Sequence, residues 1–192
     1  MHRTILFVVC ALAFALCTSA WASTPANPPA DTYKVDYFSN ANTAGAPDAT
    51  VRLTNPGTSG GNLCAAIYVF DSNQEMSECC SCFLSPDGLR TLSVNSDLTS
   101  NPLTGVTLNT GVIKIVSTAT VGGACPLPTS LTPMAAIRGF VTHVENNGFA
   151  VTETAASDAT LSTAEVGRLD GECKAIRVDG SGKGICSCGT GD

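Results

Sequence analysis

Five of the ten cysteines stand in two short segments, Cys79, Cys80 and Cys82 in one and Cys186 and Cys188 in the other. Side chains alternate between the two faces of a strand, so Cys80 and Cys82 share one face and Cys79 points to the other. Cys186 and Cys188 share a face in the same way. This spacing suits three chemistries: structural disulfides, a thiolate site for Cu(I) or Zn, and a redox pair at the CxxC spacing.

The first 22 residues have the parts of a secretory signal peptide. Arg3 supplies a basic start, Ile5 to Leu16 is an apolar stretch too short to span a bilayer, and Ala20-Trp21-Ala22 fits the cleavage rule. We therefore predict a signal peptide at 1–22, a disordered Pro-rich lead at 23–31 and one disulfide-stabilised β domain at 32–192. The expected location is extracellular, on the cell surface or periplasmic, with no membrane insertion after cleavage.

Removal of the signal leaves an even number of cysteines, which in an exported chain predicts disulfides. The candidates are Cys64, Cys79, Cys80, Cys82, Cys125, Cys173, Cys186 and Cys188. We expect at least one bond between the two cysteine segments, because each segment presents two thiols about 6.6 Å apart on one face. A bond such as Cys80–Cys188 would close a loop of about a hundred residues, worth about 4.7 kcal/mol in the chain-entropy model. The rival pattern ties the tail to Cys173 or Cys125 instead.

The metal and redox alternatives require thiols that stay reduced outside the cell. His143 is the only histidine after the signal, so a metal site would depend on the five clustered thiolates. A thioredoxin-like CxxC is followed by a helix, whereas Pro86 and Gly88 interrupt the chain soon after Cys82. Structural disulfides are therefore the favoured interpretation.

The sequence contains no recognisable catalytic set. Gly57–Gly61 superficially resembles the nucleophile loop of trypsin-like proteases, but those enzymes place His before Ser, and here His143 follows Ser59. A lone His without a nucleophile or an orienting partner indicates a plain strand residue. We predict no enzymatic activity, no catalytic residues and no bound cofactor.

Two further segments have the residue types of ligand loops. Asp71, Glu75 and Glu78 carry oxygens that suit Ca²⁺, although a solvated turn is the favoured interpretation. Residues 180–184 lack the Walker spacing, so a helix cap with a flexible turn explains them better. The net charge of −6 and the absence of a basic run argue against nucleic-acid and anionic-membrane partners.

Hydrophobic alternation and turn signals predict a mainly β protein, an antiparallel β-sandwich that is Ig-like in general architecture. The expected strands are 33–37, 50–53, 63–70, 89–94, 112–116, 136–145 and 149–154. Residues 63–70 are apolar on both faces, which indicates a central strand covered on both sides. The last two strands flank Asn146-Asn147-Gly148, a strong hairpin signal, and the Pro-rich loop 122–133 is expected to be pinned by Cys125.

The tail has helical signals. Ser162-Thr163-Ala164-Glu165 is a capping box, and apolar residues then recur at helical spacing up to Ile176. Gly180 stands where a helix C-cap would. Gly167 and Gly171 each cost about 1 kcal/mol against Ala, which leaves a hairpin turning at 179–180 as the alternative.

Four segments together resemble a group of secreted bacterial cysteine-rich proteins. They are Tyr68-Val69-Phe70-Asp71, Asn73-Gln74-Glu75, Cys79-Cys80-Ser81-Cys82 and Gly180-Ser181-Gly182-Lys183-Gly184-Ile185-Cys186. The resemblance implies a shared fold over most of the chain after the signal. The group has no assigned activity, so the resemblance implies no site residues.

These observations favour an exported, non-enzymatic structural or interaction domain of a bacterial protein, with a cell-surface or extracellular protein as its partner. The absence of an N-glycosylation sequon agrees with a bacterial exporter. One alternative is a secreted metal-binding or thiol-redox protein that uses the clusters at 79–82 and 186–188. Another is a carbohydrate-binding module, a frequent role of exported β-sandwiches that the scarcity of aromatic residues disfavours.

Overall fold

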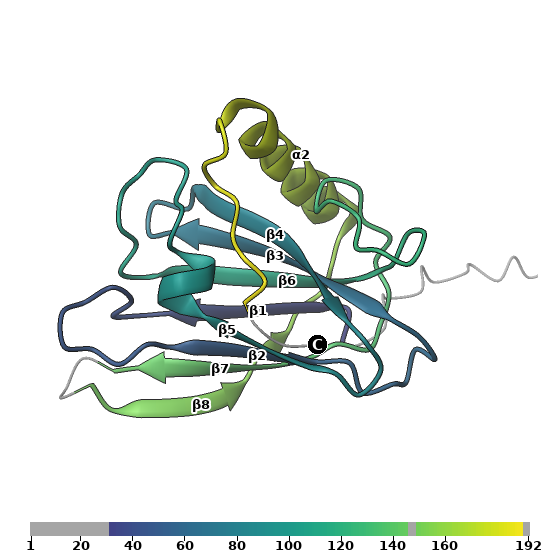
Figure 1. The fold of residues 1–192 in the computed structure, drawn as a ribbon, viewed down its shortest axis with the longest axis horizontal. Helices are drawn as coiled ribbons and strands as arrows, with labels where there is room; N and C mark the ends of the chain where they lie inside the picture. Colours follow the sequence, from purple (N-terminus) through teal and green to yellow (C-terminus); the bar gives the residue numbers. More distant parts are fainter. Residues whose placement is uncertain (1–30, 146–148, 190–192) are drawn as a thin grey trace, which may run out of the picture.

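Two antiparallel sheets pack face to face in the computed structural model, which describes residues 31–145 and 149–189 (Figure 1). One sheet has the order β4-β3-β6-β1-β9 and the other β5-β2-β7-β8. The strands are β1 Tyr33–Phe38, β2 Thr50–Thr54, β3 Leu63–Asp71, β4 Met76–Leu84, β5 Leu89–Ser93, β6 Gly111–Ala119, β7 Arg138–Val144, β8 Val151–Ala155 and β9 Ser157–Asp158. The predicted mainly β sandwich is therefore confirmed; the predicted signal peptide lies outside the described residues.

The central strand β3 is buried on both faces, as its apolar run predicts. Its neighbours are β4 and β6, both antiparallel to it. Alternate residues from Leu63 to Val69 enter the core between the sheets, whereas Ala66, Tyr68 and Phe70 enter a second core on the outer side. The five-stranded sheet thus needs a cover on its outer face.

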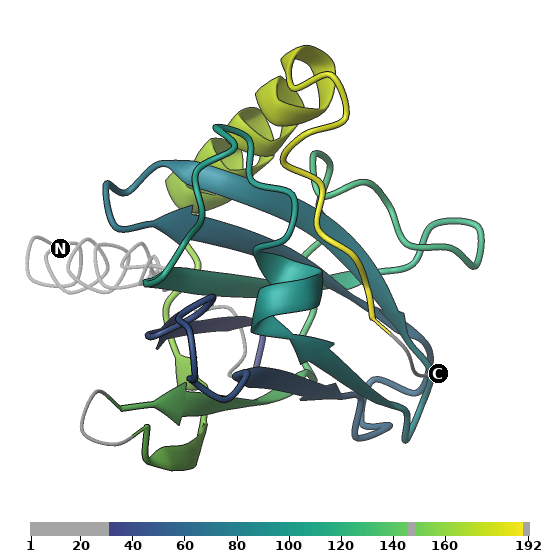
Figure 2. The same ribbon diagram turned by 60° about the vertical axis from the view of Figure 1, so that its left-hand side comes forward.

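That cover is the helix α2, Thr163–Asp179, which lies across the outer face of the five-stranded sheet (Figures 1 and 2). Ser162 caps its first turn, since its side chain accepts a hydrogen bond from the Glu165 backbone N–H at 3.1 Å. The helix packs through Leu169, Cys173 and Ile176, all of which the helical spacing predicts. The helix is therefore confirmed and the alternative hairpin is wrong.

The helix ends at Gly180, as predicted, but the left-handed turn comes after this residue. Gly180 is the C-cap, and its N–H donates to the Ile176 carbonyl, but its φ of −75° is right-handed. The left-handed residues follow at Ser181 and Gly182, with φ of 49° and 87°. The tail therefore turns back toward β4 after the cap rather than at it.

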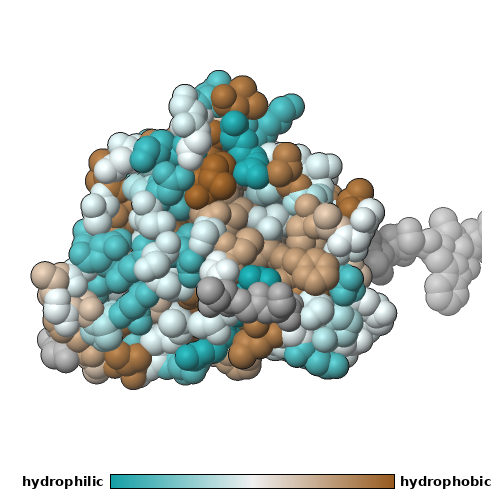
Figure 3. Space-filling model, viewed as in Figure 1, coloured by the Kyte–Doolittle hydropathy of each residue, from teal (hydrophilic) through white to brown (hydrophobic). Residues whose placement is uncertain are grey.

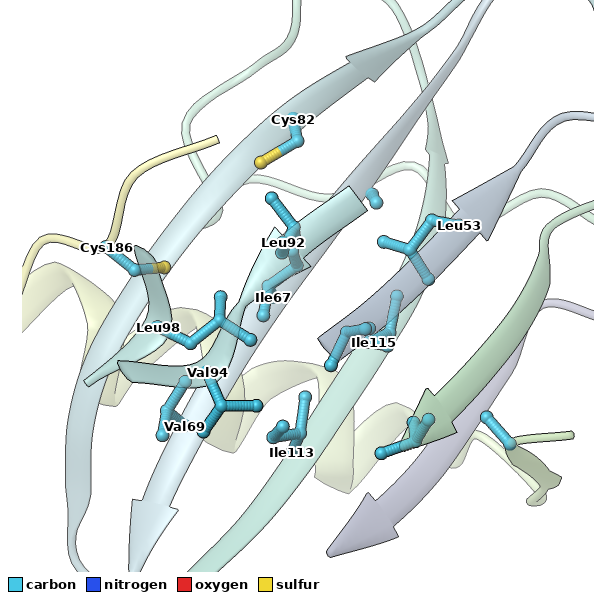
Figure 4. Packing of buried hydrophobic residues seen from close by; sticks show 14 of the residues in the cluster. Leu53, Ile67, Val69, Cys82, Leu92, Val94, Leu98, Ile113, Ile115 and Cys186 are labelled. Carbon is cyan, nitrogen blue, oxygen red and sulfur yellow. The ribbon is translucent and has the colours of Figure 1, made fainter. Parts of the chain in front are cut away.

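The core between the two sheets is made of aliphatic side chains from both inner faces, with sulfur at one end (Figure 4). Ile67, Ile115 and Leu53 are among its fully buried members. Burying such a side chain contributes about 1.5–3 kcal/mol. Cys80, Cys82 and Cys186 belong to the same cluster, so the cysteine segments extend this core along β4.

The strand β4 was not among the strands expected from the sequence, and neither were two small elements. A π-helical turn, η2 (Val94–Leu98), follows β5, and Ser93 caps it by accepting from the Ser96 N–H. The two-residue strand β9 lets the chain cross from β8 in one sheet to β1 in the other. Strands β7 and β8 form the predicted hairpin, although its Asn-Asn-Gly turn lies outside the described residues.

The face seen in Figure 3 is largely hydrophilic, and its hydrophobic residues lie in small groups. Among the described residues, no helix has both the length and the apolar character needed to cross a bilayer.

Candidate functional site

All eight cysteines of the described residues are paired in disulfides. The pairs are Cys64–Cys125, Cys79–Cys173, Cys80–Cys186 and Cys82–Cys188, with Cα–Cα distances of 5.5, 5.9, 5.2 and 5.4 Å. Alternation along β4 decides the partners. Cys79 faces outward and meets the helix, whereas Cys80 and Cys82 face the inner core and meet the tail. Cys64, on β3, pins the Pro-rich loop as predicted.

Both tail cysteines are bonded to β4, so the expected link between the two cysteine segments is present twice. The tail runs parallel to β4, with Ile185 paired to Cys79 and the Cys79 N–H donating to the Gly184 carbonyl at 2.9 Å. The parallel direction fixes the register as 80 to 186 and 82 to 188. The predicted example Cys80–Cys188 is wrong, because the parallel direction of the tail places Cys186 beside Cys80 and Cys188 beside Cys82.

Polar contacts hold the tail in this place as well. Ser187 donates its N–H to the Asp97 carbonyl at 2.9 Å and its hydroxyl to the Asp97 carboxylate at 2.5 Å. The side-chain amide of Asn101 donates to the carbonyls of Gly182 and Ile185. The tail thus covers the edge of β4 that would otherwise offer unpaired backbone groups.

Because all five cysteines of segments 79–82 and 186–188 are in disulfides, neither segment has a free thiolate that could bind a metal ion. A redox disulfide between Cys79 and Cys82 is not formed either. These two sulfurs lie on opposite faces of β4 and are bonded to different partners. No group of three or more His, Cys, Asp or Glu side chains in ranges 31–145 and 149–189 is arranged to hold a metal ion.

The three acidic residues considered for Ca²⁺ are not brought together. Asp71 closes the β3–β4 turn, since its carboxylate accepts from the N–H groups of Asn73 and Glu75. Glu78 lies on β4 and is fully buried. Its Oε1 accepts from the Asn101 N–H at 2.9 Å, its Oε2 has no hydrogen-bond partner, and burial raises its pKa to about 7.

The glycine segments are turns. Gly57 and Gly60 have φ of 75° and 74°, and the Ser59 hydroxyl donates to the Gly61 carbonyl within the same loop. Gly184 has φ of 74°, and a Cβ there would lie 2.4 Å from the Ile176 side chain. Glycine is therefore required where the tail passes under the helix end.

A cleft of about 560 Å³ lies at the open edge of the sandwich, where β1 and β9 of one sheet meet β7 and β8 of the other. We call it the His143 cleft. Its lining residues are Val35, Asp36, Tyr37, Val112, His143, Thr152, Thr154 and Ser157. This volume lies within the range of small-molecule pockets, about 300–1,000 Å³.

His143 lines the cleft, and its side chain is only 5% exposed. Its Nε2 is 2.9 Å from the Thr154 hydroxyl and 3.5 Å from the Asp36 carboxylate. Its ring stacks on Tyr37 with 4.3 Å between centroids. Sequence reasoning placed His143 in a strand beside a hairpin, but it missed Asp36 and Tyr37, because no local signal connects residues a hundred positions apart.

The two ring nitrogens of His143 have different surroundings. Nε2 faces the Thr154 hydroxyl and the Asp36 carboxylate. Nδ1 is buried and has no hydrogen-bond partner. In a nucleophile–base–acid triad the base meets its two partners through different nitrogens. Here Thr154 and Asp36 both face Nε2, which is not the arrangement of a triad.

Searches against protein-family models, curated proteins and solved structures find no match for this chain.

Proposed function

We propose that this protein is an exported interaction domain without enzymatic activity, whose β-sandwich is held by structural disulfides. The observation that carries the proposal is the set of four disulfides, which join β3 and β4 to the loop, helix and tail that follow. Disulfides form and persist in oxidising compartments, so the four bonds fit an extracellular location.

The arrangement of His143 supports binding rather than nucleophilic catalysis. Its Nε2 faces both Thr154 and Asp36, and its Nδ1 has no hydrogen-bond partner among the described residues. A broad hydrolase and oxidoreductase screen of the purified protein tests this part of the proposal. We expect no turnover. Reproducible turnover that disappears in a point variant of a polar residue would contradict it.

Metal binding or thiol redox at the cysteine clusters is the main competing function. The pairing of all five clustered cysteines supports a structural role, because a thiolate is the reactive and metal-binding form. Intact mass with and without reduction, each followed by alkylation, separates the two functions. We expect no alkylation without reduction. Free thiols together with a co-purifying metal would reverse the assignment.

A further inference from the structure

We propose that the His143 cleft is a carbohydrate-binding site that receives a neutral, hydroxyl-rich sugar ring. The inference rests on the proposed function as an interaction domain and names the chemistry of its ligand. It requires an opening in the fold, unsatisfied hydrogen-bonding groups inside it, and an aromatic wall. The cleft has all three.

The opening arises from the short strand β9. It pairs only with Lys34 and Val35 of β1, so no strand covers the β1 edge at Asp36 and Tyr37. The chain leaves β8 to reach β9, and this crossing closes one end of the cleft. All five residues of β8 are exposed. A ligand therefore has access to the cleft from the edge of the sandwich.

The hydrogen-bonding groups of the cleft call for a ligand that can both donate and accept. His143 Nδ1 is a buried nitrogen without a hydrogen-bond partner, and burying such a group unpaired is unfavourable. The Asp36 side chain is 8% exposed; its Oδ1 accepts from the Tyr37 N–H. Thr152 and Ser157 line the same space. A sugar hydroxyl is both donor and acceptor, so adjacent hydroxyls can donate to the carboxylate and pair with the imidazole nitrogen and the two side-chain hydroxyls.

The apolar part of the cleft suits the C–H face of a sugar. Tyr37 is 48% exposed, and its ring is held in one orientation by the stacked imidazole. Val35 and Val112 continue the apolar wall. Pockets that combine apolar and aromatic walls with a few placed polar groups are typical of small-molecule sites. An aromatic ring fixed in advance also loses little entropy when the ligand binds.

Charge and ligand number argue against an anion and a metal ion in the cleft. Asp36 disfavours an anion, since a carboxylate would face it in a largely buried space. A metal ion in the cleft would find only two typical ligands among the lining side chains, Asp36 and His143. The described residues contain no group of three or more His, Cys, Asp or Glu side chains that could hold a metal ion. An organic amine would also be attracted to Asp36, so the test includes one.

The experiment is a glycan array followed by calorimetric titration of the best-bound sugar. The variants are Tyr37→Ala and Asp36→Asn, and the matched control is Phe140→Ala, which removes a 41% exposed aromatic ring of β7 that does not line the cleft. We expect the wild type and the control to bind equally. We expect each cleft variant to lose affinity by about tenfold, while thermal melting shows that it remains folded.

Three outcomes would overturn the inference. They are an array without hits, sugar binding that Tyr37→Ala leaves unchanged, and binding of spermidine or choline in the cleft with no binding of sugar. None of them contradicts a non-enzymatic interaction domain, which would then bind its partner through another surface. Hydrolysis of the bound sugar would instead support the cleft and contradict the proposed function.

Discussion

Glu78 is the residue whose environment is most at odds with its charge. It lies on β4 beside the cysteines and is fully buried. Its carboxylate receives one hydrogen bond, from the Asn101 N–H, and has no hydrogen bond to its second oxygen. Burial disfavours the charged form, and this raises the pKa of Glu78 to about 7 from 4.5.

We expect the free energy of unfolding to fall as pH rises from about 4.5 to about 7. The folded protein holds the Glu78 proton up to the higher pKa, whereas the unfolded chain releases it near the lower one. The contribution is thus fully present below pH 4.5 and lost above pH 7, a change of about 3 kcal/mol. Glu165 acts outside this window, because Arg168 and Lys114 lower its pKa to about 2.

Urea unfolding at several pH values checks this expectation. Glu78→Gln keeps the acceptor for Asn101 and removes the titration, so its stability should vary less between pH 5 and 8. Glu75→Gln is the matched control, because Glu75 is an exposed glutamate on the neighbouring turn. Equal pH slopes in wild type and Glu78→Gln would show that Glu78 ionises normally in the fold.

Single residues differ in how far the sequence could predict their surroundings. Strand alternation correctly assigned Cys79 to one face and Cys80 and Cys82 to the other. It could not give the register of the tail, because a CxC pair has the same spacing in either chain direction. The buried imidazole of His143 was also beyond prediction, since Asp36 and Tyr37, which contact it, come from the other sheet.

Among the elements, α2 forms despite two glycines. Gly167 and Gly171 are exposed, and a Cβ at either position meets nothing within 4 Å. The helix is held by its capped start, its buried face and the bonds from Arg168 to Glu165 and Glu172. The glycines therefore lower its intrinsic stability without a packing role.

We expect Gly167→Ala and Gly171→Ala each to stabilise the protein by about 0.8–1 kcal/mol, since alanine loses less backbone entropy in a helix. In thermal unfolding this corresponds to a rise in Tm of about 2–4 °C per substitution. Gly184→Ala is the opposite control. It should lower Tm, because its Cβ would overlap the Ile176 side chain and its φ of 74° disfavours alanine. Unchanged Tm in the helix variants would mean that packing alone determines the stability of α2.

The helix and the larger strands except β4 could be predicted because their signals are local. The period of two in β1, the doubly apolar run of β3 and the capping box of α2 each lie within a few residues. The turn η2 and the strand β9 depend on distant groups instead. The Asp97 carbonyl and carboxylate in η2 both bond Ser187, and β9 exists only because it pairs with β1.

At the scale of the whole molecule, three disulfides join β4 to the last part of the chain. They span 94, 106 and 106 residues, but their loops overlap almost completely, because all three start within four residues of β4 and end within the last part of the chain. Once one of them is formed, the next closes only a short loop. Their contributions to stability are therefore far from additive, because the loop-closure entropy of the unfolded chain is lost mainly with the first bond.

This overlap of the three loops leads to a graded prediction. With the other bonds intact, Cys82–Cys188 closes a loop of about four residues beside Cys80–Cys186, so Cys82→Ala/Cys188→Ala should cost about 2 kcal/mol in the chain-entropy model. A single bond across 106 residues is worth about 4.7 kcal/mol, so the removal of all three should cost well more than that. Such a loss is comparable to the whole stability of a domain, about 5–15 kcal/mol.

Urea unfolding of the oxidised protein, the double variant and the fully reduced protein, in which Cys64–Cys125 is broken as well, tests this order. Non-reducing peptide mapping must accompany it, with cross-linked peptides that contain both 79–82 and 186–188. We expect a modest loss of stability in the double variant and loss of the cooperative transition, or a very low Tm, after full reduction. The hydrophobic core between the sheets remains available to the reduced chain, so residual β structure is compatible with this result.

A double variant as unstable as the reduced protein would show that Cys82–Cys188 alone holds the tail on β4. A reduced protein as stable as the oxidised one would show that the core and the tail's hydrogen bonds suffice, and that the disulfides serve another purpose.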